Sequence, residues 1–354
     1  MIAVSVSGQS IYSKKVIEKS MKSAFKWQQK NPFHELNDWT NGAYYAGVSA
    51  AWKSTGNKIY LKGMLEMAEE MKWQPAKRWY HADDITISQT YIDLSREKSV
   101  QANLEPTKET LDRILAHDGL SPEWKERGII SWWWCDALFM APPTLAKYGV
   151  DSKNMDYLKA SDKLYRQTFD LLFDKEENLW ARDVNYLWAG LDTDKKEANG
   201  KKIFWSRGNG WVFGGLAILL SELPEDYENR AFYVDIYKKM AEKLKSIQPD
   251  AGAWKSSLLD PDSHEYGETS GTGFYVFGFA WGINNGILSK EAYSETVKKG
   301  WAALTSNQFK NGKVGYVQPI GDSPSKELNA DSWEVYGTGA FLLAGSEVSK
   351  MNLD

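Results

Sequence analysis

One repeated pattern constrains the fold of this 354-residue chain more than any other feature. Six times, a polar cluster rich in Asp, Trp, Arg or Gly is followed at once by a long, almost wholly apolar stretch. Each apolar stretch gives way to a turn and then to a segment whose core residues recur every three or four positions, the spacing of an amphipathic helix. The chain is therefore a series of helical hairpins. The clusters span residues 37–39, 81–84, 133–136, 205–211, 268–271 and 331–336.

The two kinds of helix predict how the hairpins are arranged. A helix that is apolar all round must be covered on every side, whereas an amphipathic helix can face water. We therefore expect six inner helices after the clusters, closed into an all-α six-hairpin toroid, an (α/α)6 barrel. Because each inner helix begins at its cluster, the clusters should meet at one mouth. The outer helices are expected near residues 11–28, 57–73, 104–118, 152–173, 227–248 and 289–306.

The hairpins continue to the end of the chain, and no Pro/Ser-rich stretch or charge block divides it. We therefore expect a single barrel domain over residues 1–354. No stretch is long and apolar enough to span a membrane. The nearest, residues 129–141, contains Asp136 and ends at Pro142 and Pro143, so we expect a buried helix with a kink or break there.

Residues 1–9 are small and apolar but lack the basic start of a complete signal peptide. Two interpretations stay open. In one, these residues are the remnant of a trimmed signal peptide and place a bacterial protein in the periplasm. In the other, they are a disordered N-terminus of a cytoplasmic protein.

Charge and metal-ligand content narrow the class of partner. The net charge of -4 and the lack of a basic stripe argue against nucleic acid. A single cysteine, Cys135, excludes an intramolecular disulfide and a thiolate metal cluster. The four histidines show no metal-ligand spacing. We therefore expect chemistry without a metal or another cofactor, in a monomer or weak homodimer.

Tryptophan is unusually frequent, with 17 residues. Trp27, Trp73 and Trp301 fall on amphipathic segments, where packing is the expected role. Other tryptophans stand beside Asp, Arg or Asn in the polar clusters. Aromatic faces next to planar hydrogen-bonding groups suit a sugar, which offers C–H faces and hydroxyls, so we expect a carbohydrate ligand. These cluster tryptophans are Trp39, Trp134, Trp205, Trp211 and Trp333.

Several motifs, in this order, make the chain resemble a known family over residues 39–347. It is similar to the unsaturated glucuronyl and rhamnogalacturonyl hydrolases, glycoside hydrolase family 105, which is related to family 88. The motifs are His81-Ala82-Asp83-Asp84, Trp132-Trp133-Trp134-Cys135-Asp136-Ala137, Trp205-Ser206-Arg207-Gly208-Asn209-Gly210-Trp211, Glu268-Thr269-Ser270-Gly271-Thr272, Ala280-Trp281-Gly282-Ile283-Asn284 and Gly315-Tyr316-Val317-Gln318.

The resemblance implies an enzyme that removes a 4,5-unsaturated uronic acid from the nonreducing end of an oligosaccharide made by a polysaccharide lyase. It implies hydration of the C4=C5 enol ether, followed by opening of the hemiketal. Asp136 is then the general acid/base, which protonates C4 and activates the water that attacks C5. The Ala-Asp-Asp motif supplies the second catalytic carboxylate, for which we favour Asp83 over Asp84. By frequency in the family, the neighbouring sugar is rhamnose, from pectin rhamnogalacturonan or ulvan.

Physical chemistry supports a catalytic role for Asp136. Protonation of a carbon needs a carboxylic acid that stays neutral, and burial beside Trp133, Trp134 and Phe139 with a second carboxylate nearby would raise the pKa of Asp136. The alternative is that Asp136 only caps a helix. Similarly, either Asp83 or Asp84 is expected to cap the helix over residues 85–94.

The remaining residues of the clusters are predicted to bind substrate. Arg207 can pair with the uronate carboxylate, because its planar fork matches a carboxylate; the alternative is a buried ion pair with Glu268 or Glu334. We expect Trp205 and Trp211 to stack on the sugar, and Thr269 and Ser270 to contact its hydroxyls. The other predicted substrate-binding or rim residues are Trp39, His81, Trp134, Asn209, Trp333, Glu334 and Tyr336.

Two other functions fit the same residues. The first is a conventional inverting glycosidase, which would use Asp136 with Asp83 or Glu334, separated widely enough for a water. The second is a sugar-binding protein without activity, for which the tryptophans suffice. The leaving-group subsite is expected in the loops at residues 183–204 and 319–330, and the source polysaccharide stays open.

Overall fold

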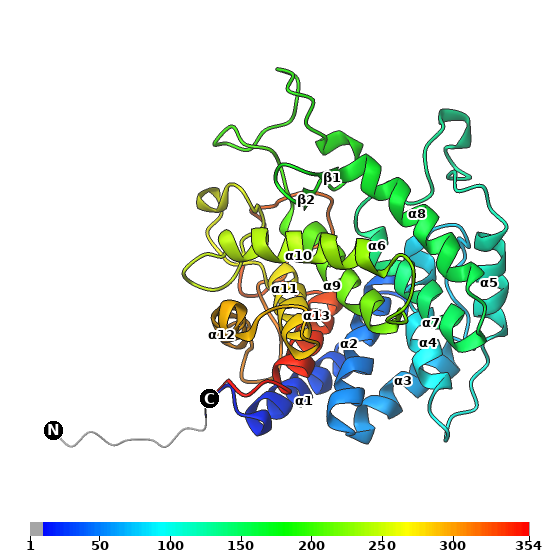
Figure 1. Cartoon of the computed structure of the whole chain (residues 1–354). Coiled ribbons are helices and arrows are strands. Elements are labelled where there is room, and N and C mark those ends of the chain that lie inside the picture. Colours follow the sequence, from blue (N-terminus) through cyan, green and yellow to red (C-terminus); the bar gives the residue numbers. More distant parts are fainter. Residues whose placement is uncertain (1–9, 354) are drawn as a thin grey trace.

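In the computed structural model, which describes residues 10–353, the regular secondary structure is almost entirely helical (Figure 1). All six expected outer helices are present, within a few residues of the predicted ranges. They are α1 (Lys14–Lys30), α3 (Lys58–Glu70), α5 (Glu105–Leu115), α8 (Asp156–Leu172), α10 (Arg230–Ser246) and α12 (Lys290–Ser306).

The inner helices follow the polar clusters and form a closed ring. Each contacts the next along the chain, and the last contacts the first, so the prediction of an (α/α)6 barrel is confirmed. The outer helices pack against this ring from outside, as α3 does on α2 and α10 on α9. The inner helices are α2 (Trp39–Thr55), α4 (Ser88–Ser95), α6 (Ala137–Met140) with α7 (Pro142–Ser152), α9 (Ser206–Glu222), α11 (Thr269–Asn284) and α13 (Val335–Val348).

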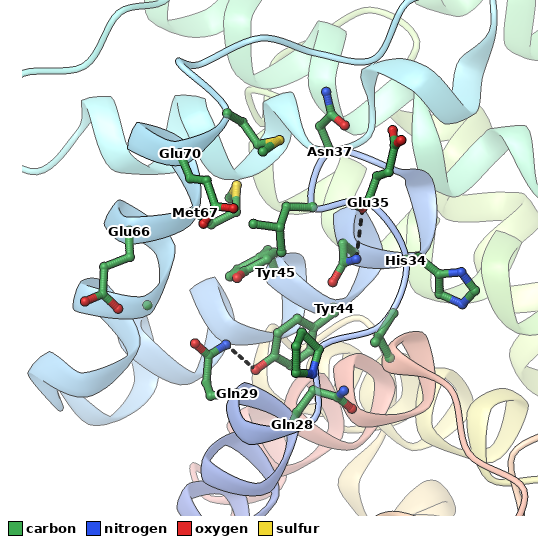
Figure 2. Close-up of a pocket in the computed structure, with 16 residues that line it drawn as sticks. Gln28, Gln29, His34, Glu35, Asn37, Tyr44, Tyr45, Glu66, Met67 and Glu70 are labelled. Atoms are coloured by element: carbon green, nitrogen blue, oxygen red, sulfur yellow. Dashed lines mark hydrogen bonds between the residues drawn. The ribbon is translucent and has the colours of Figure 1, made fainter.

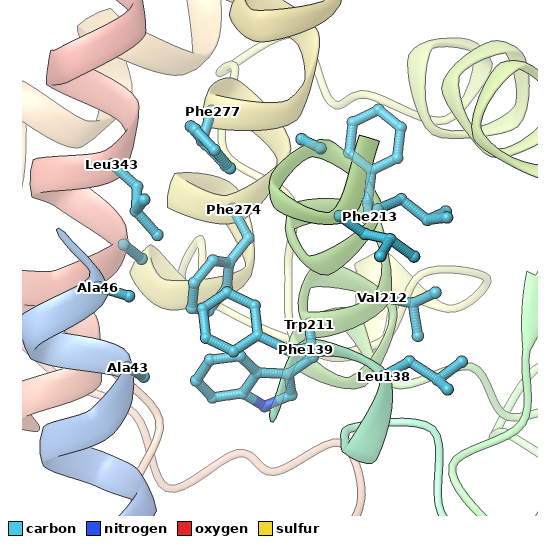
Figure 3. Packing of buried hydrophobic residues seen from close by; sticks show 14 of the residues in the cluster. Ala43, Ala46, Leu138, Phe139, Trp211, Val212, Phe213, Phe274, Phe277 and Leu343 are labelled. Carbon is cyan, nitrogen blue, oxygen red and sulfur yellow. The ribbon is translucent and has the colours of Figure 1, made fainter. Parts of the chain in front are cut away.

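The ring is packed tightly enough to require glycine where helices touch. A Cβ built on Gly47 of α2 would lie 2.3 Å from the carbonyl oxygen of Gly339 in α13, and one on Gly339 would lie 2.5 Å from that of Ala43. Large apolar side chains fill the rest of the interior, as Phe139, Trp211 and Phe274 do in Figure 3. The core therefore lies inside the ring of inner helices, beyond the end at which the polar clusters lie.

The expected break after residue 141 is confirmed. Helix α6 ends at Met140 and α7 begins at Pro142. A proline ring has no N–H to donate and clashes with the carbonyl four residues back, so two prolines interrupt the helix. Asp136 directly precedes α6 and therefore lies at the end of the barrel where the inner helices begin.

Two short strands and four 3-10 turns lie in the connections between the helices. The strands β1 (Phe173–Asp174) and β2 (Leu179–Trp180) form an antiparallel pair with Phe173 opposite Trp180, which the sequence did not predict. The 3-10 turns are η1 (Ala82–Ile85), η2 (Lys125–Arg127), η3 (Val184–Tyr186) and η4 (Pro261–Ser263).

Two further predictions concern packing and the chain ends. Trp73 and Trp301 are buried, and Trp27 packs edge-on against Trp333, so all three pack as expected. Within residues 10–353, each helix is too short or too polar to cross a bilayer. The signal-peptide remnant predicted at residues 1–9 lies outside the described residues.

Candidate active site

A cavity of about 170 Å³ lies where several inner helices begin. Four of the six clusters contribute to its wall: Trp39, Asp83, Trp134 with Asp136, and Trp205 with Trp211. The predicted shared mouth therefore exists for these four. The other residues of the wall are Met140, Arg182, Ile320 and Gly321.

Asp136 faces this cavity at the N-terminal end of α6. Its side chain makes no capping hydrogen bond, so the capping alternative is not supported. Its Oδ2 atom lies 3.3 Å from Nε of Arg182, and the side chain is 10% exposed. Burial raises the pKa of Asp136 above its usual value, while the positive charge of Arg182 opposes that rise. Burial therefore favours the acid form of this carboxyl, and the positive charge of Arg182 favours the carboxylate.

Asp83 lines the same cavity from η1. Burial raises the pKa of Asp83 to about 8, and the charge of Asp136 adds to the rise. His81 stands beside it, with Nδ1 3.6 Å from Oδ2 of Asp83. Burial also lowers the pKa of His81 to about 4, so this ring is neutral at pH 7 and does not draw the proton from Asp83.

Asp84 points away from the cavity and binds Arg78. Its Oδ1 accepts from Nη2 of Arg78 at 2.6 Å, and its Oδ2 accepts from the backbone N–H of Arg78 at 2.8 Å. Neither Asp83 nor Asp84 caps the next inner helix, which begins at Ser88 after an Ile87 without a side-chain cap. The capping prediction is wrong, and Asp84 stabilises the loop that carries Asp83.

Arg207 does not reach the cavity wall. Its side chain is fully buried, with Cζ 4.4 Å from the ring centre of Trp205 and 4.7 Å from that of Tyr336. Its Nη1 and Nη2 donate to the carbonyl oxygens of Gln318 and Pro319 at 2.5 and 2.9 Å. The predicted contact with the uronate is therefore not supported, and neither is an ion pair with a glutamate within residues 10–353. Arg207 instead holds the loop that brings Ile320 and Gly321 to the cavity.

Arg182 is the cation in the cavity wall, and the sequence analysis missed it. Its Nη1 donates to Oδ2 of Asp183 at 2.8 Å, its Nε faces Asp136, and its carbonyl oxygen accepts from Cys135 N–H at 2.9 Å. It was missed because it precedes no inner helix. The available signal was the charged pair Arg182-Asp183 directly after the apolar residues 179–181.

Asn209 explains how Arg182 is placed. Its Oδ1 accepts from the backbone N–H of Trp180 at 2.8 Å, and its Nδ2 donates to the carbonyl oxygen of Trp180 at 3.0 Å. These bonds fix β2 and the residues after it against α9. Asn209 is completely buried, so its predicted contact with substrate is replaced by this structural role.

Aromatic rings line the cavity as predicted for Trp39, Trp134, Trp205 and Trp211. Trp39 stacks on Tyr336 with ring centres 5.5 Å apart. Trp205 donates from Nε1 to Oε1 of Gln318 at 3.0 Å. These contacts fix the rings before a ligand arrives, which lowers the entropy cost of stacking a sugar on them. His81 packs against Trp134, with ring centres 4.5 Å apart and ring planes tilted by 34°, and it is not part of the cavity wall.

Residues of the last two clusters, 268–271 and 331–336, lie outside the cavity wall and make their contacts within the fold. Thr269 Oγ1 donates to the carbonyl oxygen of Gly315 at 2.8 Å, and Ser270 Oγ donates to Oε1 of Glu268 at 2.6 Å; both side chains are fully buried. Their predicted contact with sugar hydroxyls is therefore not supported. Trp333 packs on Trp27 and Phe33 outside the cavity wall.

Two other predicted rim residues also have structural partners. Oε2 of Glu334 lies 2.8 Å from Nε2 of His34, and the hydroxyl of Tyr336 donates to the carbonyl oxygen of Gln318 at 2.7 Å. Within residues 10–353, no group of three or more His, Cys, Asp or Glu is placed to hold a metal ion.

A six-hairpin barrel with two buried carboxyls in a tryptophan-walled cavity defines a glycoside hydrolase of the (α/α)6 class. The family described as Glycosyl Hydrolase Family 88 matches residues 12–352, and the chain belongs to this family. It is an enzyme, as the resemblance implied.

Two relatives carry the same name, unsaturated 3S-rhamnoglycuronyl hydrolase. The one from Formosa agariphila is 47% identical over 346 residues, which cover 95% of this chain and 91% of the relative. The one from an Alteromonas species is 38% identical over 324 residues, or 88% and 77% of the two chains. A solved family 88 glycosyl hydrolase from Bacteroides vulgatus is 30% identical, with a TM-score of 0.87 over 96% of this chain and 99% of that one.

Proposed function

We propose that the enzyme removes a 4,5-unsaturated uronate from the nonreducing end of lyase-generated oligosaccharides in which rhamnose is the next sugar. The observation that carries this proposal is the pairing of Asp83 and Asp136 in one tryptophan-walled cavity, each with a raised pKa. The name shared by the two relatives supports the choice of sugars.

The size of the cavity supports action at a chain end. Its volume of about 170 Å³ is small, since pockets for drug-sized ligands measure about 300–1,000 Å³. Such a cavity suits one terminal sugar better than a polysaccharide that passes through. The faces of Trp39, Trp134 and Trp211 offer surfaces on which that sugar can stack.

The reaction we propose is hydration of the C4=C5 double bond. Asp136, in its acid form, gives its proton to C4. The resulting carboxylate, stabilised by Arg182, accepts a proton from the water whose oxygen bonds to C5. The product at C5 is a hemiketal, which opens to a ketone as the bond between C5 and the ring oxygen breaks. This opening leaves a hemiacetal at C1, whose bond to the glycosidic oxygen then breaks, so that C1 becomes an aldehyde and the shortened sugar leaves with its own glycosidic oxygen. Asp136 ends the cycle protonated, so one water is consumed and no other reactant is needed.

Asp83 and Arg182 assist in different ways. With a pKa of about 8, Asp83 stays protonated at pH 7, where it can donate a hydrogen bond to the sugar without adding a second negative charge beside the carboxylate that Asp136 forms when it gives up its proton. Arg182 stands at the cavity wall, where its guanidinium can pair with the uronate carboxylate, the role that the sequence analysis gave to Arg207.

The test is a comparison of an unsaturated uronyl-rhamnose disaccharide with its saturated counterpart. The proposal predicts release of rhamnose from the first substrate only, with loss of the ultraviolet absorbance of the conjugated double bond. Release of rhamnose from the saturated disaccharide at a similar rate would instead support the conventional inverting glycosidase.

A further inference from the structure

A second cavity, of about 260 Å³, lies at the opposite end of the barrel from the catalytic cavity. The inner helices all begin at the catalytic end, and the wall of this distal cavity comes mainly from their other halves. In Figure 3, the ring of Phe274 lies between Phe277, which lines the distal cavity, and Trp211, which lines the catalytic cavity. Each of the six inner helices contributes to the distal wall: Lys53, Asp93, Lys147, Glu222, Trp281 and Glu347.

The charged side chains of the distal cavity neutralise one another. Nζ of Lys53 and Nζ of Lys147 lie 2.8 and 2.7 Å from Oδ1 of Asp93, and Nζ of Lys147 also lies 3.7 Å from Oε1 of Glu222. The wall as a whole contains three cations and three carboxylates, which are Lys53, Lys147 and Lys350, and Asp93, Glu222 and Glu347. A charged ligand would have to separate such pairs, which is costly for buried groups. The distal cavity therefore favours a neutral ligand.

Gln89 supplies a buried oxygen that has no partner. Its side chain is 1% exposed and lines the distal cavity, and its Oε1 accepts no hydrogen bond within residues 10–353. Its Nε2 donates to the carbonyl oxygens of Phe139 and Met140 at 3.0 and 3.3 Å, and these bonds fix the orientation of the amide. Because a buried acceptor without a partner is costly, a ligand that offers a hydroxyl to Oε1 is stabilised there.

Trp281 brings an aromatic ring and a donor to the same cavity. It is 5% exposed, and its indole N–H donates no hydrogen bond within the described part of the chain. Phe277, one helical turn earlier on α11, adds a second ring. Rings beside polar groups suit a sugar, because its C–H face packs on a ring and its hydroxyls both donate and accept hydrogen bonds.

We propose that the distal cavity binds one neutral monosaccharide. Its volume of about 260 Å³ exceeds that of the catalytic cavity, about 170 Å³, so it has room for one sugar ring. One hydroxyl of the sugar donates to Oε1 of Gln89, and another accepts from the indole N–H of Trp281. This site is separate from the proposed reaction, and its ligand differs from the substrate because it has no carboxylate.

A wider hollow of about 970 Å³ lies between α1, α2 and α3 and serves as a comparison (Figure 2). Tyr45 lines it, and the hydroxyl of Tyr45 forms no hydrogen bond within residues 10–353. The carboxylates of this hollow, Glu35, Glu66 and Glu70, are exposed. A sugar bound there would depend on Tyr45 rather than on Trp281.

The test is isothermal titration calorimetry with rhamnose, xylose and glucose as neutral probes, and with glucuronate and glucosamine as charged relatives of glucose. At least one neutral probe should bind wild-type enzyme with a stoichiometry of about one and a Kd in the millimolar range. Ala50→Leu, which enlarges a half-buried side chain of the cavity wall, should abolish this binding. Trp281→Phe, which keeps a ring and removes the N–H, should weaken it by about tenfold.

Tyr45→Phe is the matched control and should bind the neutral probe as wild type does. An unfolding temperature close to that of wild type shows that each variant is folded. The binding of glucuronate and glucosamine that Ala50→Leu removes should be at least about tenfold weaker than that of the neutral probe.

Three results would overturn the inference. The first is no binding of any neutral probe up to about 50 mM, which would mean that water alone fills the cavity. The second is binding that survives both Ala50→Leu and Trp281→Phe, or that Tyr45→Phe abolishes. The third is a charged probe that binds in the distal cavity as tightly as the neutral one, which would overturn the choice of a neutral ligand.

Discussion

Nε of Arg182 lies 3.3 Å from Oδ2 of Asp136, inside a cavity that also contains Asp83. Because of this contact, the two buried carboxyls of Asp136 and Asp83 are expected to play different roles. Both have raised pKa values, but Arg182 forms its ion pair with Asp136 and stabilises that carboxylate most directly. We therefore assign the proton-transfer role to Asp136 and the neutral, hydrogen-bonding role to Asp83.

The first prediction concerns Asp136. The change Asp136→Asn keeps the size of the side chain and removes the acid, so kcat should fall by roughly 10²- to 10⁴-fold while the thermal unfolding temperature changes little. Asp84→Asn is the control, since Asp84 binds Arg78 instead of facing the cavity. It should lower the unfolding temperature and affect kcat far less. A folded Asp136→Asn enzyme with near-normal kcat would refute the assignment.

The second prediction concerns the pH dependence of activity. With the pKa of Asp83 at about 8, raising the pH through 8 ionises this group, so it can no longer donate a hydrogen bond to the sugar, and its negative charge repels the uronate carboxylate. The value of kcat/KM should therefore fall above about pH 8. The Asp83→Asn enzyme will be much less active, but this descending limb should be absent from its profile. The measurement is kcat/KM between pH 5 and about 9.5.

The same carboxyl gives a third prediction, for stability. Its folded pKa of about 8 lies above the ordinary aspartate value of 3.8, so folding favours the protonated form. The contribution of this carboxyl to stability is fully present below the unfolded pKa and is lost as the pH rises through about 8. Each unit of pKa elevation corresponds to about 1.4 kcal/mol. Asp83→Asn should thus raise the unfolding temperature relative to wild type at pH 9 more than at pH 4. Equal differences at both pH values would show that Asp83 is not a raised-pKa group.

The fourth prediction separates the two arginines. Arg182→Lys keeps the charge at the cavity wall but loses the planar fork, so kcat/KM should fall by about tenfold or more, and by less on the methyl ester of the uronate. Arg207→Lys should chiefly lower stability, by about 2 kcal/mol, because the carbonyl groups of Gln318 and Pro319 lose their buried donors. If Arg207→Lys discriminates acid from ester and Arg182→Lys does not, the roles are reversed.

Much of the fold was predictable because inner helices carry an unambiguous signal. Helices such as α11 and α13 are buried along almost their entire length, so they consist mostly of apolar and small residues. This pattern made the order of the inner helices predictable, and the two prolines made the break at Pro142 predictable. The family resemblance implied the pair Asp83 and Asp136, and both line the cavity because each stands at the start of an inner helix or in its leading turn.

The roles of other cluster residues were less predictable. Arg207, Asn209, Thr269 and Ser270 have polar side chains at the right end of the barrel, but each hydrogen-bonds to the backbone or to a neighbouring side chain of the fold. Sequence position gives the level of a residue in the barrel and does not give the direction of its side chain. Arg182 was missed because it lies outside the polar clusters, in the connection between α8 and α9. The hydrogen bonds between Asn209 and Trp180 of β2 bring this connection to the cavity.

The hydration mechanism is the central claim, and deuterium incorporation tests it most directly. In hydration, a solvent proton is delivered to one face of C4 and water adds at C5, whereas in ordinary glycoside hydrolysis water attacks C1 and C4 gains no hydrogen. The reaction should be run in deuterated water with an unsaturated uronyl-rhamnose disaccharide and followed by NMR at early times, before the new ketone promotes exchange at C4. The account predicts one stereospecific deuterium at C4, which appears at the rate at which the double-bond absorbance is lost. Release of rhamnose with no stereospecific deuterium at C4, or with the absorbance unchanged, would contradict it.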